Sequence, residues 1–342
     1  MDTGTNKMTR APQTMTKYEK RALQLMNRFN IDRPLLPNRS IQKEFCDWLI
    51  TIKIPTWKKS TWKYNKYSLL YFLEGKVSNC RDFYIAIKNI GYENCKKQNA
   101  RTPYSQRNTS AKKAKSVSDK QLEKLWEQGP ILAANSYWSR IGLDVFKTIY
   151  HVGMRPIEFG SAYMSDELLP NGDTRPYLEI VNAKNTNGRT HGPSRCIYLN
   201  NYPKTIIDEI HQTILLCQSP KDGQGNSLPF DQFMRRCSEG FSRLTKKLFP
   251  TMHKRIVLYT ARHLFAANLK FMGYQPVHIA TIMGHGVDTT AFRHYARATS
   301  GRSAYRPIHS EQESQQVRQK YKAFHGMQHV KHKAHAQQTM RH

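Results

Sequence analysis

Residues 259–297 read YTARHLFAANLKFMGYQPVHIATIMGHGVDTTAFRHYAR. The apolar spacing and the glycines predict short helices joined by tight turns, and the stretch carries Arg262, His285 and Tyr295 close together in sequence. A guanidinium holds a phosphate group, an imidazole donates a hydrogen bond to it, and a phenolic oxygen can attack it. The stretch therefore predicts chemistry on a phosphodiester, provided that the rest of the chain supplies further cationic groups.

The charge of the chain points in the same direction. The sequence has 342 residues and a formal net charge of +29. Such an excess of Lys and Arg favours a polyanionic partner, of which nucleic acid is the commonest, over the alternative of a solvated basic surface. The length predicts two domains.

The cysteines and the N-terminus predict the compartment. None of the six cysteines forms a Cys-x-x-Cys pair, which is typical of free thiols in a reducing environment. The first residues are polar and lack the apolar core of a signal peptide, and no run is long enough to cross a membrane. We expect an intracellular, cytoplasmic and nucleoid-associated protein that does not bind membranes.

Helical periodicity dominates the chain, and one β-prone pair of segments, 177–181 and 195–199, flanks the Asn187–Gly188 turn signal. The predicted fold class is mostly α with a small antiparallel β-hairpin or sheet. The predicted organisation is a basic N-terminal arm (1–37) with one short helix, a helical DNA-binding domain (38–95), a basic linker (96–116), a mixed α+β catalytic domain (117–305), and a C-terminal helix with a basic tail (306–342).

Two basic clusters are candidates for contact with a phosphate backbone. The first lies on the small helical domain and comprises Lys58, Lys59, Lys63 and Lys66. The second follows the linker and comprises Lys96, Lys97, Arg101, Arg107, Lys112, Lys113 and Lys115. The sequence leaves open whether these side chains bind DNA or form a solvated face and a plain spacer.

Outside the opening stretch, Arg155 is followed three residues later by Glu158, and Lys184 precedes the Asn-Gly signal. A lysine at a hairpin tip can serve as a general acid for a sugar oxygen. Each residue also has a structural interpretation. Arg155 can be a buried arginine paired with Glu158, Tyr295 a packing residue, and His285 a side chain that caps a helix C-terminus.

The ordered set resembles the tyrosine recombinase (phage integrase) family. The matching residues are Gly-Met-Arg155-Pro-Ile-Glu158, Lys184, Tyr259-Thr-Ala-Arg262-His263, Gly284-His285 and Tyr295. The resemblance covers about residues 118 to 300, and the preceding helical domain is similar to the core-binding domain of that family. Each motif is weak singly, whereas five motifs in this order are specific.

The resemblance implies roles for these residues. Arg155 and Arg262 would clamp the scissile phosphate, with Glu158 as a supporting residue. Tyr295 would attack the phosphate and form a 3′-phosphotyrosyl bond. Lys184 would protonate the leaving 5′-oxygen, and His285 would hydrogen-bond the phosphate.

Because one ester replaces another, the reaction implied by the resemblance needs neither ATP nor a metal ion. The implied partner is double-stranded DNA with attachment sites, bound by a homo-tetramer, with room for an accessory protein that sets direction. The implied biology is integration or excision of a mobile element. His329, His332 and His335 in the tail lack a second ligand cluster, so a basic tail is favoured over a metal site.

One position departs from the family pattern. Tyr259 stands where the family usually has a histidine, and a tyrosine donates a hydrogen bond but is a poor base at neutral pH. Deprotonation of Tyr295 is then left to His263, to solvent or to the arginines. Two alternatives stay open: a type IB topoisomerase that acts as a monomer, and a non-catalytic DNA-binding protein on the same scaffold.

Overall fold

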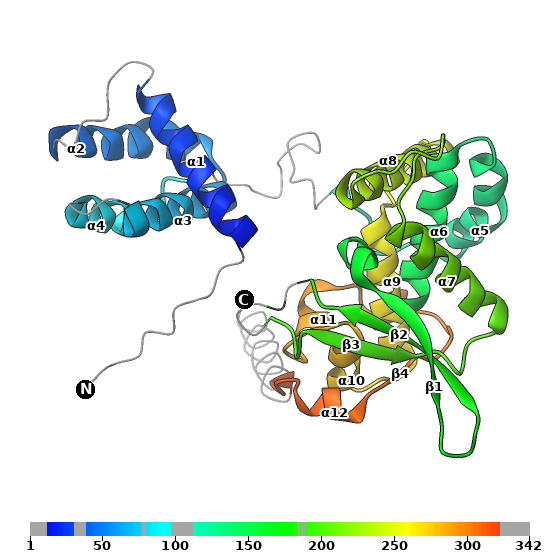
Figure 1. The fold of residues 1–342 in the computed structure, drawn as a ribbon. Helices are drawn as coiled ribbons and strands as arrows, with labels where there is room; N and C mark the ends of the chain where they lie inside the picture. Colours follow the sequence, from blue (N-terminus) through cyan, green and yellow to red (C-terminus); the bar gives the residue numbers. More distant parts are fainter. Residues whose placement is uncertain are drawn as a thin grey trace, which may run out of the picture. The chain divides into compact units, whose positions relative to one another are not determined.

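The computed structural model describes residues 12–30, 39–76, 80–96, 112–183, 185 and 189–321. The chain forms two compact units, residues 1–107 and 108–342, which are described separately (Figure 1).

The first unit is a small helical bundle. It comprises α1 (Pro12–Asn30), α2 (Arg39–Trp48), α3 (Lys59–Lys76) and α4 (Arg81–Asn89), with a π-helical and a 3-10 turn between α2 and α3. Its core is built around the fully buried Trp62, Phe45 and Leu49. Trp62 donates its indole N–H to the carbonyl oxygen of Gly91 at 2.8 Å, so the largest core side chain has no unpaired polar group.

Helix α1 differs from the predicted N-terminal arm. Ala22, Leu25 and Phe29 lie on one face of the helix and are buried in the core of the small unit. The Nε of Arg21 also donates a hydrogen bond to Asn65 on α3 at 2.8 Å. The sequence predicts the helix but places it in an arm, whereas its apolar face completes the bundle.

The second unit has one core surrounded by helices and a small sheet (Figure 1). Its helices are α5 (Asp119–Ala133), α6 (Tyr137–Val152), α7 (Lys204–Gln218), α8 (Phe230–Leu248), α9 (Leu258–Phe271), α10 (Pro276–Ile282), α11 (Thr290–His294) and α12 (Glu311–Gln315). Ser118 caps α5 in a capping box with Gln121, and Gly153 ends α6 in the left-handed conformation at φ 66°. In the sequence, Ser118 predicts the start of a helix and Gly153 the end of one, and both predictions are confirmed.

The sheet has four antiparallel strands in chain order: β1 (Tyr163–Leu168), β2 (Thr174–Val181), β3 (Ser194–Tyr198) and β4 (Ile308–His309). The β2–β3 pair, with Tyr177 opposite Tyr198, confirms the predicted hairpin, and the mostly helical fold class is confirmed. Residues 182–193 join the two strands, and the Asn187–Gly188 turn signal lies outside the described residues. Strands β1 and β4 are not predicted from the sequence.

The predicted C-terminal helix is interrupted. The sequence indicates a helix over 311–324, but α12 ends at Gln315, residues 316–320 are not helical, and Tyr321 is helical again; residues 322–324 lie outside the described part of the chain. The carboxylate of Asp288 accepts hydrogen bonds from the backbone N–H groups of Lys320 at 2.8 Å and Tyr321 at 3.1 Å. These groups are therefore paired with a side chain instead of with a helical turn. The tail histidines lie outside the described residues.

The end of the predicted linker is attached to the N-terminal side of α9. The backbone of Arg255 donates to the carbonyl of Lys112 at 2.9 Å and accepts from the N–H of Ala114 at 2.8 Å. The hydroxyl of Thr260, in the first turn of α9, donates to the carbonyl of Ala114 at 2.8 Å. In the part of the chain that the structure describes, no helix is long and apolar enough to cross a membrane.

Candidate active site

Arg262 is the centre of the site. Its side chain is fully buried on α9 and donates to the carbonyl oxygens of Gly153 and, at 2.6 Å, Met283. These two residues cap the C-termini of α6 and α10, where carbonyl groups are unpaired and a cation is favoured by the helix dipole. Arg262 therefore holds two helix ends together and presents its Nε–H to Tyr295 at 3.0 Å.

Tyr295 follows α11 directly. The sequence places it on a short helix, but α11 ends at His294 and Tyr295 is its C-cap, in an extended conformation at φ −108° and ψ 171°. The Nζ of Lys270 donates to the carbonyl oxygens of Ala291 at 2.8 Å and Ala296 at 2.7 Å. Lys270 thereby fastens both sides of the Tyr295 segment to α9. Burial lowers the pKa of Lys270 to about 8.

The hydroxyl groups of Tyr259 and Tyr295 are hydrogen-bonded at 2.9 Å. Burial acts to raise the pKa of the Tyr295 hydroxyl, but the charge and hydrogen bond of Arg262 and the hydrogen bond from Tyr259 outweigh it, and the net pKa is lowered. Burial raises the pKa of Tyr259 to about 12. When Tyr295 ionises, Tyr259 is thus the group that keeps its proton and donates it, and the Tyr295 oxygen is the acceptor.

A buried ionic network lies next to this pair. Glu158 accepts hydrogen bonds from Arg155 at 2.5 Å and from Arg195 at 2.8 Å. Burial acts to raise the pKa of Glu158, but the charges of Arg195, Arg262 and Arg155 outweigh it and hold the pKa well below its usual range. The Arg155–Glu158 pairing is the structural interpretation weighed from the sequence. It fixes the backbone and side chain of Arg155, whose remaining N–H groups can bind a ligand.

Arg195 is a site residue that the sequence analysis misses. It is fully buried on β3 and donates to the carbonyl of Ile282 at 2.9 Å and to the side chain of Asn182. The sequence feature that could have identified it is an arginine at an inward-facing position of a strand, because a buried charge needs partners. Arg195 connects the hairpin, Glu158 and the end of α10.

Gly284 allows this close packing. Its φ is 65°, and a Cβ at this position would lie 2.3 Å from the Asn182 side-chain oxygen and 2.7 Å from the Arg195 guanidinium. Only glycine adopts this positive φ without strain and has no Cβ to clash with these side chains. The following residue, His285, is therefore turned toward the Arg262 side chain.

His285 is 2% exposed, and its Nε2 lies 3.2 Å from the Nη2 of Arg262. Burial, reinforced by the nearby arginines, lowers its pKa well below the ordinary value, so the imidazole is neutral. Since the guanidinium can only donate, Nε2 is the acceptor and the proton lies on Nδ1. Nδ1 is buried without a hydrogen-bond partner among the described residues, which leaves an N–H donor unpaired.

His263 is close to Tyr295 but is not hydrogen-bonded to it in the part of the chain described. The two ring centroids lie 5.0 Å apart. Burial lowers the pKa of His263 to about 4, helped by the charges of Lys115 and Arg262. Of the three sources of activation left open by the sequence, the arginine is the one in contact with the Tyr295 oxygen.

The structure brings together six of the seven predicted catalytic residues: Tyr295, Arg155, Arg262, His285, Tyr259 and Glu158. Lys184 lies outside the described residues. The backbone N–H of Ala183, one residue before it, donates to Glu158 at 3.3 Å. Ala183 therefore lies beside the Arg155–Glu158 pair.

The predicted DNA-binding side chains differ in exposure. Those of Lys59, Lys63, Lys96, Lys113 and Lys115 are exposed, and those of Lys58 and Lys112 are half-buried. Lys97, Arg101 and Arg107 lie outside the described residues. Lys66 is half-buried, and its ammonium group donates a hydrogen bond to the carbonyl of Ile90, in the same small unit, at 2.6 Å.

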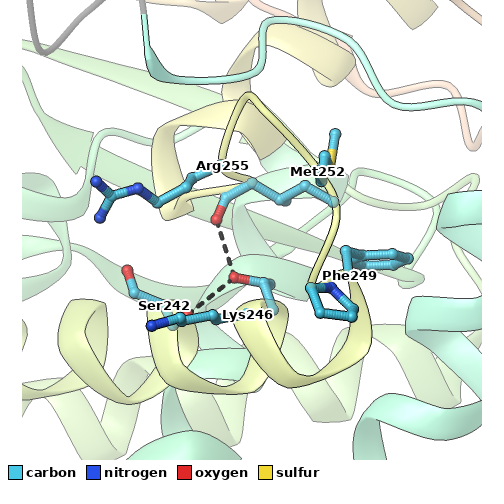
Figure 2. Close-up of a pocket in the computed structure, with 8 residues that line it drawn as sticks. Ser242, Lys246, Phe249, Met252 and Arg255 are labelled. Carbon is cyan, nitrogen blue, oxygen red and sulfur yellow. Dashed lines mark hydrogen bonds between the residues drawn. The ribbon is translucent and has the colours of Figure 1, made fainter. Parts of the chain in front are cut away.

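A basic pocket lies beside the attached end of the linker. It has a volume of about 300 Å³ between the end of α8 and the segment leading to α9. Figure 2 shows the cationic groups of Lys246 and Arg255 on the same side as Ser242, with Phe249 and Met252 on the other. Neither of these two cations is among the residues predicted from the sequence.

Comparison with known proteins gives structural likeness only. No protein-family model and no curated protein matches the sequence. The fold is similar to an integrase of the transposon Tn1549 in complex with circular intermediate DNA, at 15% identity and a TM-score of 0.47 over 83% of this chain and 94% of that one. It is similar to protelomerase TelA covalently complexed with substrate DNA, at 15% identity and a TM-score of 0.46 over 86% of this chain and 91% of that one.

A third likeness is to XerA recombinase, at 14% identity and a TM-score of 0.36 over 85% of this chain and 90% of that one. The solved structures to which this chain is similar include a transposon integrase, a recombinase and a protelomerase.

Proposed function

We propose that the chain cleaves and rejoins DNA strands through a covalent bond between Tyr295 and a 3′-phosphate, as a site-specific recombinase. The observation that carries the proposal is the Arg262–Tyr295 hydrogen bond at 3.0 Å within a cluster of arginines. A buried tyrosine whose pKa is lowered by an arginine in direct contact is an activated nucleophile.

In the proposed reaction Tyr295 loses its proton to solvent, its oxygen forms a bond to phosphorus, and the bond from phosphorus to the 5′-oxygen breaks. The leaving oxygen takes a proton, for which Lys184 is the proposed donor. Arg155 and the unpaired Nδ1–H of His285 bind the non-bridging oxygens, where negative charge develops. Attack by a 5′-hydroxyl reverses the step and frees the tyrosine, so the energy of the ester is kept.

The proposed task of Tyr259 is to donate a hydrogen bond to the Tyr295 oxygen, and not to act as a base. Its pKa of about 12 supports this assignment, since a group that keeps its proton is a donor at every working pH. The assignment removes the difficulty that Tyr259 raises in the sequence. A phenol can stabilise the nucleophilic phenolate even though it is a poor base.

The proposed route for DNA passes over the exposed lysines of the small unit, the end of the linker at Lys113 and Lys115, and the pocket with Lys246 and Arg255. Lys115 lies close enough to His263 to affect its pKa, which supports a cationic path that reaches the site. A homo-tetramer on paired attachment sites, an accessory directionality factor and a role in a mobile element belong to the same proposal.

The test uses a library of nicked duplexes with randomised sequence, so that the unknown target does not have to be guessed. Adducts that survive denaturation are isolated, and their DNA is sequenced. The wild type is expected to yield adducts enriched in one sequence, and Tyr295→Phe none. Tyr305→Phe is the matched control, because Tyr305 is 38% exposed and is not one of the site residues.

Adducts from Tyr295→Phe at the wild-type level would show that another residue is the nucleophile. No adduct from the wild type, together with binding of the same library, would favour the non-catalytic DNA-binding protein. With the selected sequence, a strand-exchange assay separates the recombinase from a type IB topoisomerase, which would relax supercoiled DNA without exchanging strands.

A further inference from the structure

Three side chains with metal-ligating atoms meet away from the candidate active site. His278 lies in the first turns of α10, His309 ends β4, and Glu311 begins α12. One nitrogen from each histidine and one carboxylate oxygen all lie within 4.8 Å of one another. Three separate elements of the large unit therefore supply one potential ligand each.

One of the three distances between the potential ligand atoms matches that around a bound zinc ion, and the other two are at most 4.8 Å. The His309 Nε2 and the Glu311 carboxylate oxygen are 3.4 Å apart. In a tetrahedral zinc site with bonds of 2.0–2.1 Å, two ligand atoms are separated by about 3.3 Å. The imidazole rings of His278 and His309 lie with centroids 4.2 Å apart, so the two histidines are direct neighbours.

The His309 nitrogen is a buried group whose bonding is incomplete. Its side chain is 10% exposed, and Nε2 is buried without a hydrogen-bond partner among the described residues, despite its distance to Glu311. An imidazole nitrogen without a hydrogen-bond partner is available as a metal ligand.

We propose that His278, His309 and Glu311 bind one zinc ion, with a water molecule as the fourth ligand. Two imidazoles and a carboxylate suit zinc better than calcium or magnesium, which prefer sites made entirely of oxygen. The exposed Glu311 side chain gives the ion access from solvent. The site does not depend on the proposed reaction, in which no metal takes part.

The consequence of binding is structural. The ion would join β4 and α12 to α10, where Thr281 and Ser314 already form a hydrogen bond at 3.1 Å. The cap of α10, Met283, accepts the hydrogen bond from Arg262. Zinc would therefore stabilise the helix that supports the central arginine, without touching it.

The experiment uses the full chain without an affinity tag, stripped of metal with a chelator. Zinc affinity is measured by competition with a chromogenic chelator, and the geometry from the visible absorption of bound cobalt(II). His278→Ala and His309→Ala are expected to weaken the tight site at least tenfold, and Glu311→Gln to weaken it as well. The thermal midpoint of the wild type should rise by about 5 °C with saturating zinc.

The control is the joint replacement of His329, His332 and His335 by alanine, since the tail could also bind zinc. This variant should still bind one zinc ion tightly. Its loss there, or unchanged binding in His278→Ala and His309→Ala, would overturn the proposal. Glu311→Gln decides the matter if a histidine variant fails to fold, because the Glu311 side chain is 79% exposed and its replacement leaves the core intact.

Discussion

The Tyr259 hydroxyl lies 2.9 Å from the Tyr295 hydroxyl, and the pKa of the first is raised while that of the second is lowered. This relationship makes one tyrosine the donor and the other the acceptor. It also connects the pH dependence of the proposed cleavage to a residue that does not itself react.

Tyr259→Phe should slow adduct formation at pH 7 by about 10- to 100-fold, as expected for loss of a hydrogen bond to a charged group. The rate depends on the phenolate, so a lowered pKa of Tyr295 gives more phenolate at neutral pH. Loss of the donor raises that pKa and moves the rate profile to higher pH. The measurement is single-turnover adduct formation between pH 6 and 10. An equal loss at every pH would contradict the donor role.

Lys270→Met should reduce adduct formation while DNA affinity stays unchanged. The substitution removes the two hydrogen bonds that hold Ala291 and Ala296, and so loosens the segment that carries Tyr295. Single-turnover rates and equilibrium binding of the same duplex are compared. Lys120→Met, at an exposed position on α5, is the control. A parallel loss of affinity would assign Lys270 to DNA binding instead.

Arg195→Met should lower the free energy of unfolding by about 3–5 kcal/mol, because it leaves Glu158 charged and buried with one partner fewer. Arg175→Met on the adjacent strand is the matched control. Arg175 pairs with Glu167 at the surface, where the loss should be at most about 1 kcal/mol. Urea unfolding of both variants measures the difference, and equal losses would argue against a structural role for the buried network.

Gly284→Ala should destabilise the fold more than Gly273→Ala. Both glycines have positive φ, at 65° and 80°, so both substitutions strain the backbone. Only at Gly284 would the new Cβ meet other atoms, the Asn182 and Arg195 side chains. Thermal midpoints compare the two. Adduct formation should also fall in Gly284→Ala alone, since His285 follows directly.

The fold should lose stability as the pH falls from about 6.5 to 4. Burial lowers the pKa of His151 and of His263 to about 4, so the folded state binds fewer protons than the unfolded state in this range. The lowered pKa of Glu158 adds to the loss below its ordinary value of 4.5. Urea unfolding at successive pH values measures the slope, which should be smaller in His151→Gln. A stability that is flat or rises on acidification would contradict the assignment.

The sequence predicts the elements that have a local signal. The capping residues Ser118 and Gly153 mark helix ends correctly, and the alternation in 177–181 identifies β2. Strand β4 is too short to have a pattern, since Ile308 and His309 are strand only because β3 offers an open edge. Helix α1 is visible locally, but its place in a core depends on the distant α3.

The site shows the same difference between features with a local sequence signal and features that depend on remote contacts. The resemblance identifies Arg155, Arg262 and Tyr295 by their order, without any distance between them. Arg195 cannot be found in this way, because its importance comes from Glu158 and Ile282, which are remote in sequence. The direction of the Tyr259–Tyr295 hydrogen bond follows from burial and from Arg262, neither of which is readable from residue types.

The attachment of residues 112–114 to Arg255 and Thr260 has a mechanical consequence. Thr260 lies between Tyr259 and Arg262 in the first turn of α9, so a displacement of residues 112–114 is transmitted to the turn that holds both side chains. Such a displacement would change the hydrogen bonds at the Tyr295 oxygen, and in the proposed reaction it would thereby change the reactivity of Tyr295.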